Sequence, residues 1–458
     1  MAGIGFELRK ILRRDSLTGT MTAYGYAGLI SAGPLILSIV AILLIGLLSL
    51  PVMKSPERIV QFQMSVTYLI AVSLIVTGAM QLSFTRFMSD RLFEKRPDRV
   101  LPNYTAVSLV TTALTGTLGI VLAFTAFRDQ PTPYRLLMLV GFVIVSNIWI
   151  GVIFLASVKQ YLSIIAIFFL GYAATLILSV SLNRYGLNGL MAGFVLGHLI
   201  LLTGLASVIH RNYRSDTYIA WEVFDRRFMY PSLMFVGVLF NLGVWLDKFM
   251  FWFSPATGQQ VIGPLRASLI YDLPVFISYL CVIPGMAVFL LRIETDFVEF
   301  YDAYYDAVRS GGTLKHIREM RDMMVRSVRT GLYEILKIQA LVTLLIFAFG
   351  DKLLRLLGIS TLYLPLLHID VISASLQVLF LGGLNVFFYL DRRLVVLALT
   401  ATFVTLNGLF TWITLMIGPN AYGYGFAVSL MVVILLTMFL LDRRFKSLEY
   451  ETYMLQSG

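Results

Sequence analysis

The sequence predicts an all-α polytopic membrane protein with twelve transmembrane helices. Of its 458 residues, 58% are hydrophobic and only 14% are charged, whereas about 25% of the residues in a soluble domain are charged. A membrane-spanning helix needs about 20 mostly apolar residues, and the chain contains twelve such runs. Strands of membrane barrels have about 10 residues of alternating polarity, a pattern that these runs lack.

The twelve runs follow one another along the chain and are separated by polar connections. They cover residues 22–50, 60–84, 103–127, 135–158, 161–182, 188–209, 230–254, 266–291, 332–349, 364–390, 394–417 and 424–441. The first run is too long for the apolar part of a signal peptide and has no convincing cleavage site. We therefore expect it to be retained as a membrane span.

Lysine and arginine lie mainly on one side of the predicted membrane. Segments on the side of the N-terminus hold 26 of these 36 residues, the opposite segments hold 8, and Lys248 and Lys337 lie inside predicted spans. Because positively charged loops stay in the cytoplasm, both termini are predicted to be cytoplasmic. The same asymmetry explains the net charge of +10, so no role in nucleic-acid binding is expected.

A polar stretch at 211–229 divides the twelve spans into two sets of six. The predicted organisation is an N-terminal six-helix lobe at 1–210, this cytoplasmic linker, and a C-terminal six-helix lobe at 230–458. Parallel repeats of this kind suggest two lobes around a central cavity; the alternative is a helical bundle without a cavity. Proline and glycine inside spans favour kinks that serve gating, and the candidates are Gly33, Pro34, Pro274 and Pro284.

The largest connection, 292–331, is predicted to form a cytoplasmic amphipathic helical hairpin. Its first half has an apolar and aromatic stripe at helical spacing and an acidic polar face, whereas its second half is mainly basic. The basic residues that could dock a cytoplasmic partner are Lys315, Arg318, Arg321, Arg326 and Arg329. In the alternative interpretation the two helices lie on the lipid headgroups and pair with each other.

Ionisable residues inside three spans of the second half fall at a similar predicted depth. They are Asp247, Lys248, Asp272, His368 and Asp370. Charges within a bilayer are costly and tend to mark function, so these residues are candidates for ion coupling or for lining a cavity near the extracytoplasmic side. Three roles stay open: structural ion pairing between helices, a proton or cation site, and contact with substrate hydroxyl groups. Asp247 and Lys248 point about 100° apart on one helix, which predicts different partners for them.

An enzymatic function is not expected. The longest soluble segment has roughly 40 residues, too few for a typical catalytic domain, and the sequence has no phosphate-binding glycine loop, catalytic triad or metal-ligand cluster. We therefore predict no catalytic residue, no metal and no cofactor. The scarcity of basic residues inside the spans favours a neutral or hydroxyl-rich cargo over a multiply charged one.

The N-terminal stretch "MAGIGFELRKILRRDS", followed by "AYGYAGLISAGPLILSIV", resembles the PelG family, the inner-membrane component of the Pel exopolysaccharide machinery. The resemblance extends to the length and the twelve-span layout. It implies the fold of the multidrug/oligosaccharidyl-lipid/polysaccharide (MOP) flippase superfamily and a place in the bacterial inner membrane. It also implies export of a galactosamine-rich polymer made in the cytoplasm by a PelF-like glycosyltransferase, with PelD-like and PelE-like membrane partners.

Two other functions stay open on the sequence. One is an ion-coupled flippase for a lipid-linked oligosaccharide. The other is a non-transporting scaffold that recruits a glycosyltransferase through the hairpin at 292–331.

Overall fold

Long helices account for nearly all of the chain. The computed structural model describes residues 17–51, 55–157 and 160–454. Of the two stretches that carry the family resemblance, residues 1–16 lie outside the described residues and residues 23–40 lie in the first described helix. Within the described residues, eleven helical segments are long and apolar enough to cross a membrane. The first predicted run lies in α2 (Leu17–Ser49), of which the segment Ile36–Ser49 is a shorter apolar helix. Helices suit these runs because every backbone polar group is satisfied within the helix.

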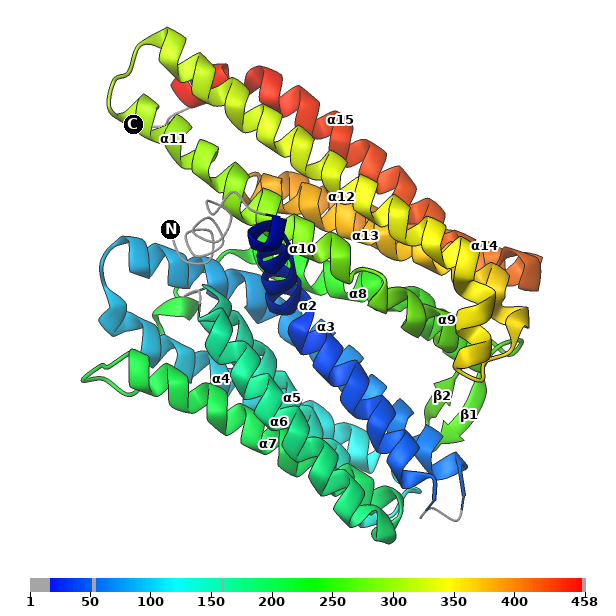
Figure 1. Ribbon diagram of the computed structural model, residues 1–458. Coiled ribbons are helices and arrows are strands. Elements are labelled where there is room, and N and C mark those ends of the chain that lie inside the picture. Colours follow the sequence, from blue (N-terminus) through cyan, green and yellow to red (C-terminus); the bar gives the residue numbers. More distant parts are fainter. Residues whose placement is uncertain (1–16, 52–54, 158–159, 455–458) are drawn as a thin grey trace. The chain divides into compact units, whose positions relative to one another are not determined.

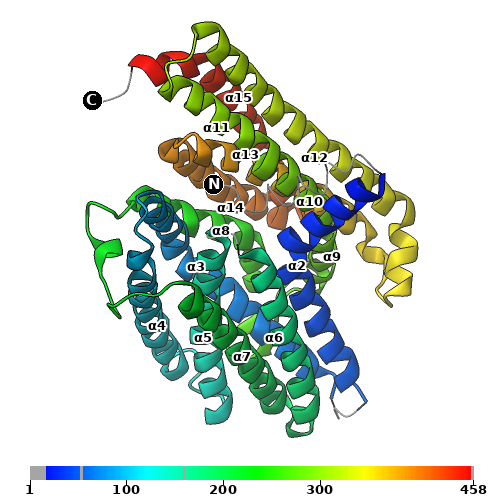
Figure 2. The same cartoon turned by 60° about the vertical axis from the view of Figure 1, so that its left-hand side comes forward.

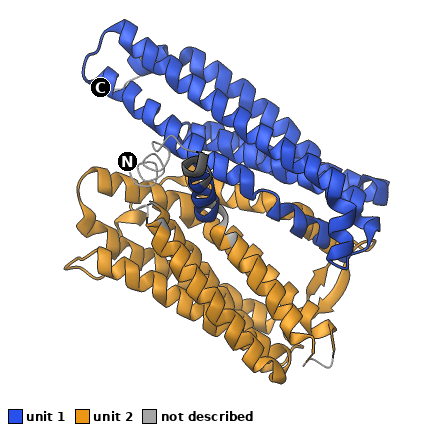
Figure 3. Cartoon of the chain, in the orientation of Figure 1, with its two compact units in different colours: residues 1–32, 269–458 blue, residues 33–268 orange. Residues whose placement is uncertain are grey.

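The chain forms two compact units, which are described separately. Unit 2 contains residues 33–268, and unit 1 contains residues 1–32 and 269–458 (Figure 3). These bounds differ from the lobes expected at 1–210 and 230–458, because the seventh predicted span clusters with the helices that precede it. The expected lobes and linker stay a prediction.

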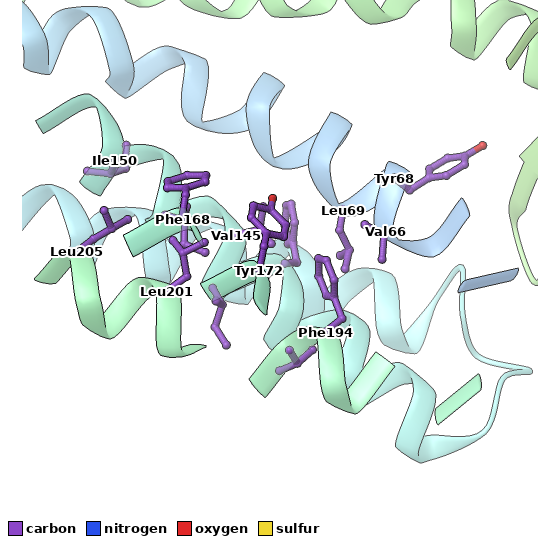
Figure 4. Close-up of a cluster of buried hydrophobic side chains, with 14 of the residues drawn as sticks. Val66, Tyr68, Leu69, Val145, Ile150, Phe168, Tyr172, Phe194, Leu201 and Leu205 are labelled. Carbon is purple, nitrogen blue, oxygen red and sulfur yellow. The ribbon is translucent and has the colours of Figure 1, made fainter. Parts of the chain in front are cut away.

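Unit 2 is built from the second half of α2 and six further helices. These are α3 (Glu57–Phe93), α4 (Val100–Phe124), α5 (Thr132–Ser157), α6 (Tyr161–Leu182), α7 (Leu187–Asn212) and α8 (Pro231–Phe253). The helix α3 packs against α5 and α8, and α5 packs against α4 and α7. Their buried side chains form one large apolar core, in which Phe168, Tyr172 and Phe194 lie close together (Figure 4).

The helices α6 and α7 run side by side as a tight antiparallel pair (Figures 1 and 2). Small residues allow the two backbones to approach: a Cβ on Gly193 would lie 2.6 Å from the carbonyl carbon of Leu178, and one on Gly197 would lie 2.5 Å from the Cα of Thr175. The pair is joined by a short turn (Asn183–Tyr185) that ends at Gly186, whose φ of 69° favours glycine. This hairpin is therefore defined by glycine at its interface and at its turn.

A short antiparallel pair of strands follows α8 in unit 2. The strands are β1 (Gln259–Ile262) and β2 (Leu265–Ala267), with Gln260 opposite Arg266. The sequence did not predict them, since they are too short to give a periodic signal.

Unit 1 contains the remaining helices. They are α9 (Leu269–Leu280), α10 (Ile283–Leu291), a π-helical turn (Arg292–Phe297), α11 (Val298–Arg309), α12 (Leu314–Leu356), α13 (Leu364–Tyr389), α14 (Arg393–Ile417) and α15 (Tyr424–Met454). The helix α13 packs against α9, α12 and α15 and is the most deeply buried of the candidate membrane spans among the described residues. It is thus the central helix of this unit.

Two predicted segments of unit 1 have different limits in the structure. The predicted run 266–291 is interrupted at Cys281 and Val282, between α9 and α10. The predicted hairpin at 292–331 has its turn at 310–313, but its second helix continues without a break through the next predicted span as α12, 43 residues long. A single rigid helix therefore connects the polar segment to the membrane.

Candidate functional site

Asp247 and Lys248 of α8 form an ion pair in the interior of unit 2. The side chain of Asp247 is fully buried and that of Lys248 is 4% exposed. The Lys248 Nζ donates to Asp247 Oδ2 at 3.0 Å and to Oδ1 at 3.2 Å, and also to the carbonyl oxygen of Val244 at 2.9 Å. The flexible lysine side chain bends back to the carboxylate of its neighbour, and the expectation that the two residues face different further partners stays a prediction.

The helix that carries this pair crosses α3 at two glycines. A Cβ on Gly78 would lie 2.7 Å from the carbonyl oxygen of Gly237, so the backbones are in direct contact at this point. One turn further along α8, Asn241 donates from Nδ2 to the carbonyl oxygen of Leu74 at 3.0 Å. These contacts fix the rotation of α8 and hence the direction in which Asp247 points.

Arg266 ties the end of α8 to the strands that follow it. Its Nε donates to the carbonyl oxygen of Trp252 at 3.0 Å, and its Nη2 donates to that of Gly258 at 2.8 Å. The hydroxyl of Tyr68 on α3 donates to the carbonyl oxygen of Arg266 at 3.0 Å. In the sequence analysis Arg266 was only one of the charges in the segments opposite the N-terminus. Its role was not predicted, because its hydrogen-bond partners are backbone atoms, which leave no pattern in the sequence.

The other three ionisable candidates lie in unit 1. Asp370 of α13 is 3% exposed, and its Oδ1 would lie 3.2 Å from a Cβ on Gly423. Asp272 lies in the first turn of α9, which packs against α13, and is partly buried. The ring of His368 lies 4.3 Å from that of Phe347 on α12. The five candidates thus fall into one pair in unit 2 and one group in unit 1, and their joint layer stays a prediction.

A buried polar network lies at the break between α9 and α10. Gln339 of α12 is 1% exposed and donates from Nε2 to the carbonyl oxygen of Val282 at 3.2 Å. Its Oε1 accepts from the hydroxyl of Ser375 on α13 at 3.0 Å. Pro284 lies in the first turn of α10, where its missing N–H does no harm.

The gating candidates therefore differ in their surroundings. Pro284 directly follows the break between α9 and α10, whereas Pro274 lies inside α9. Gly33 and Pro34 lie inside α2, at the boundary where its residues pass from one compact unit to the other. Sequence reasoning missed Gln339, although a glutamine in an apolar run is a signal of a buried hydrogen-bond network.

At the opposite end of unit 1, the arginines of α12 pair with acidic residues of α15. Arg321 and Arg318 contact Glu449, the latter at 3.4 Å, and Arg329 contacts Asp442 at 2.9 Å. Among the described residues, Lys315 and Arg326 make no ion pair, and both are exposed. The predicted docking residues thus divide into three that bind α15 and two that face outward.

Near the end of α15, Glu451 pairs with two arginines. Glu451 accepts from Arg444 at 2.6 Å and from Arg392, and its neighbour in the helix, Ser447, donates to it at 2.9 Å. The sequence predicted charge complementarity between the two halves of the hairpin. In the structure, Arg318, Arg321 and Arg329 of α12 pair with α15, and Glu451 pairs with Arg392, just before α14, and with Arg444 of its own helix. Residues so distant in sequence leave no local pattern that reveals their pairing.

The aromatic stripe that runs from the end of the π-helical turn into α11 packs largely against helices of its own unit. Phe297 and Tyr304 are buried, the former against the ring of Tyr389 at 5.5 Å, and the hydroxyl of Tyr304 lies 3.1 Å from that of Thr452. In the preceding π-helical turn, Glu294 accepts from Asn385 at 2.6 Å. Such turns are frequent at functional sites, and this one anchors α11 to α13.

A second polar cluster lies where α3 ends in unit 2. The hydroxyl of Tyr230, just before α8, donates to Asp90 at 2.9 Å, and Arg86 pairs with the same carboxylate at 3.1 Å. Burial, and then the negative charge of Asp90, raise the pKa of Tyr230. This cluster links α3 to the start of α8.

These helices have the fold of multidrug and toxin extrusion (MATE) transporters of the MOP superfamily. The similarity to an outward-facing multidrug resistance MATE transporter covers 93% of this chain and 96% of the transporter's chain, with a TM-score of 0.67 and 14% sequence identity. The similarity to the VcmN transporter of Vibrio cholerae covers 97% of this chain and 98% of that transporter's chain, with a TM-score of 0.65 and 13% identity. A MOP transporter of Pyrococcus furiosus gives 93% and 96% coverage, a TM-score of 0.65 and 12% identity.

Residues 1–453 match the model of one protein family, described as "PelG: Putative exopolysaccharide Exporter (EPS-E)". The chain belongs to the PelG family of exopolysaccharide exporters, which are transporters and not enzymes. A search of curated proteins finds no match to it. The expected family, fold and multi-pass membrane nature are confirmed.

Proposed function

We propose that this protein exports the galactosamine-rich Pel polymer across the bacterial inner membrane as the polymer is made in the cytoplasm. The observation that carries this proposal is the match of residues 1–453 to an exopolysaccharide exporter family, on a fold shared with MOP transporters. The low content of charged side chains in the spans supports a cargo that is not multiply anionic, because such a cargo calls for several basic residues.

Both termini lie in the cytoplasm in this proposal. The support is the excess of lysine and arginine in the segments on the N-terminal side. The polar ends of α11, α12 and α15 then extend into the cytoplasm, on the side where the polymer is synthesised. The ion pairs of Arg321 with Glu449 and of Arg329 with Asp442 support a preformed platform at this position.

This platform docks the synthesis partners, namely a PelF-like glycosyltransferase with PelD-like and PelE-like membrane proteins. Lys315 and Arg326 are the contact residues, because both are exposed and available to an acidic surface. Arg318, Arg321 and Arg329 act by holding α12 against α15. Partner contact through exposed charges is expected to weaken with salt.

Ion coupling is assigned to Asp370 and Asp272, with His368 nearby. Asp370 is supported by its burial and by its position on the central helix α13, since a carboxylate in such surroundings can change protonation when water reaches it. Asp247 and Lys248 are assigned a structural role, because each neutralises the other at 3.0 Å. The break before Pro284, the Gly33–Pro34 segment and Pro274 provide the positions at which spans bend during transport.

The decisive experiment measures movement of labelled polymer into proteoliposomes. The vesicles contain this protein alone, this protein with the PelF-like synthase and its membrane partners, or the partners alone. Polymer should accumulate inside only when this protein is present. Synthesis without accumulation would favour a scaffold, and movement of a lipid-linked oligosaccharide without the synthase would favour a flippase; either result would overturn the proposal.

A further inference from the structure

An apolar crevice of about 220 Å³ lies within unit 2 among α3, α4 and α5. Its walls include Leu69 and Val72 of α3, Leu122 and Ala123 of α4, and Met138 of α5. A dry apolar cavity of roughly 150 Å³ can hold a benzene molecule, so this crevice has room for part of one hydrocarbon chain.

The last residue of α8 and the segment that follows it also line the crevice. Phe253, Pro264 and Leu265 line it there, and the bond from Tyr68 to the backbone of Arg266 holds this segment against α3. Figure 4 shows the ring of Tyr68 pointing away from the side chains of Val66 and Leu69 on the same helix. The crevice is thus lined by α3, α4 and α5 and by the residues at the end of α8 and after it.

The crevice borders the helix of unit 2 that is most exposed to the surroundings. In the segment Pro97–Phe124, which contains α4, only 22% of the most apolar stretch is buried inside the protein. The side chains of Val121 and Phe124 are 51% and 68% exposed. In a membrane protein such apolar surface meets the acyl chains of the bilayer. The substance available to fill the crevice is therefore lipid.

One cationic side chain lies at the rim of the crevice. Arg135, in the first turn of α5, lines it and donates from Nη1 to the carbonyl oxygens of Ala123 at 3.3 Å and Arg128 at 3.4 Å. A guanidinium group has five N–H donors, so donors are left for a further acceptor. Arginine is well suited to phosphate because its planar fork binds two oxygens at once.

We propose that this crevice binds one acyl chain of a membrane phospholipid while Arg135 contacts the headgroup phosphate. The combination of an apolar slot beside an exposed span and a cation at its rim matches both parts of such a lipid. This site involves neither the buried ion pair of α8 nor the ionisable residues of unit 1, and it does not depend on the identity of the exported polymer.

The test uses a phospholipid that carries a photoreactive diazirine on one acyl chain, in nanodiscs containing the full-length protein. After irradiation, peptide mass spectrometry should find label on the lining residues of α4 and α5. The variant Ala123→Trp fills the crevice and should lower this label several-fold. The matched variant Val121→Trp, on the same helix but outside the lining, should leave it unchanged.

A second arm tests the headgroup contact. Arg135→Gln should lower labelling by the phospholipid about fivefold, the effect of one cation beside a lipid surface, and should not change labelling by a diacylglycerol with the same reactive chain. Arg128→Gln, which alters an exposed cation outside the lining, is the control. An equal loss in both variants, or no loss in either, would overturn the phosphate contact.

The folding of each variant is checked by helix content and by elution as a single species. Should Ala123→Trp fail to fold, Ala126→Trp replaces it, since Ala126 lines the crevice beyond the end of α4. Unchanged labelling in a folded, crevice-filling variant would overturn the proposal. Equal loss in Val121→Trp would do the same, because it would mean that the label reports on lipid around the whole helix.

Discussion

Lys248 is held within 3.0 Å of the carboxylate of Asp247, its neighbour in sequence, in the interior of unit 2. The lysine side chain turns back along α8, and its Nζ also donates to the carbonyl oxygen of Val244. Two buried charges that neutralise each other are costly to separate.

Removing one member of this pair should destabilise the protein more than removing both. Lys248→Met or Asp247→Asn alone should lower the free energy of unfolding by about 3–5 kcal/mol, because an uncompensated polar or charged group is left buried. The double variant should recover most of this loss. Thermal unfolding in detergent, followed by tryptophan fluorescence, measures the effect; single variants as stable as the unmodified protein would contradict it.

Asp370→Asn should reduce polymer export without preventing insertion into the membrane. The physical reason is that an amide cannot take up and release a proton at the depth at which Asp370 is buried. Secreted polymer, normalised to the amount of protein in the membrane, is the measurement. The control is Asp351→Asn, which alters a half-exposed carboxylate paired with Arg355 at 3.0 Å. Export at the unmodified level from both Asp272→Asn and Asp370→Asn would exclude the coupling role.

Gly78→Ala should destabilise unit 2, whereas Gly116→Ala should not. An added Cβ on Gly78 meets the backbone of Gly237 at 2.7 Å, and one on Gly116 meets nothing within 4 Å. Both changes improve helix propensity by up to about 1 kcal/mol, so the difference between them isolates the helix crossing. Overpacking should cost Gly78→Ala about 1–3 kcal/mol. Similar unfolding temperatures for the two variants would show that α3 and α8 can separate freely at this point.

Charge reversals on α12 should separate the two groups of predicted docking residues. Arg321→Glu should loosen α12 from α15, and the added change Glu449→Arg should restore both the fold and partner binding, because the ion pair is re-formed with exchanged signs. Lys315→Glu with Arg326→Glu should weaken co-purification with the glycosyltransferase while leaving thermal stability unchanged. Unaltered co-purification in that last variant would count against contact through these exposed residues.

The sequence alone determined the class of the protein and most of its helices. The predicted runs at 161–182 and 394–417 match α6 (Tyr161–Leu182) and α14 (Arg393–Ile417) almost residue for residue. The prediction of these spans is accurate because a bilayer requires each span to have a certain length and to be apolar. Both properties can be recognised in a run of consecutive residues. The polar ends of α11 and α12 were equally visible, because amphipathic spacing is also a local property.

Tertiary structure alone decided which helices pack together and which charges meet. The contact of Gly78 with Gly237, the network from Gln339 to Ser375, and the pairing of Arg321 with Glu449 each join residues far apart in the chain. Their partners are often backbone atoms or single side chains, and neither leaves a periodic pattern. Local sequence records what one helix requires of the lipid, whereas packing between helices depends on shapes that form only when distant segments are brought together.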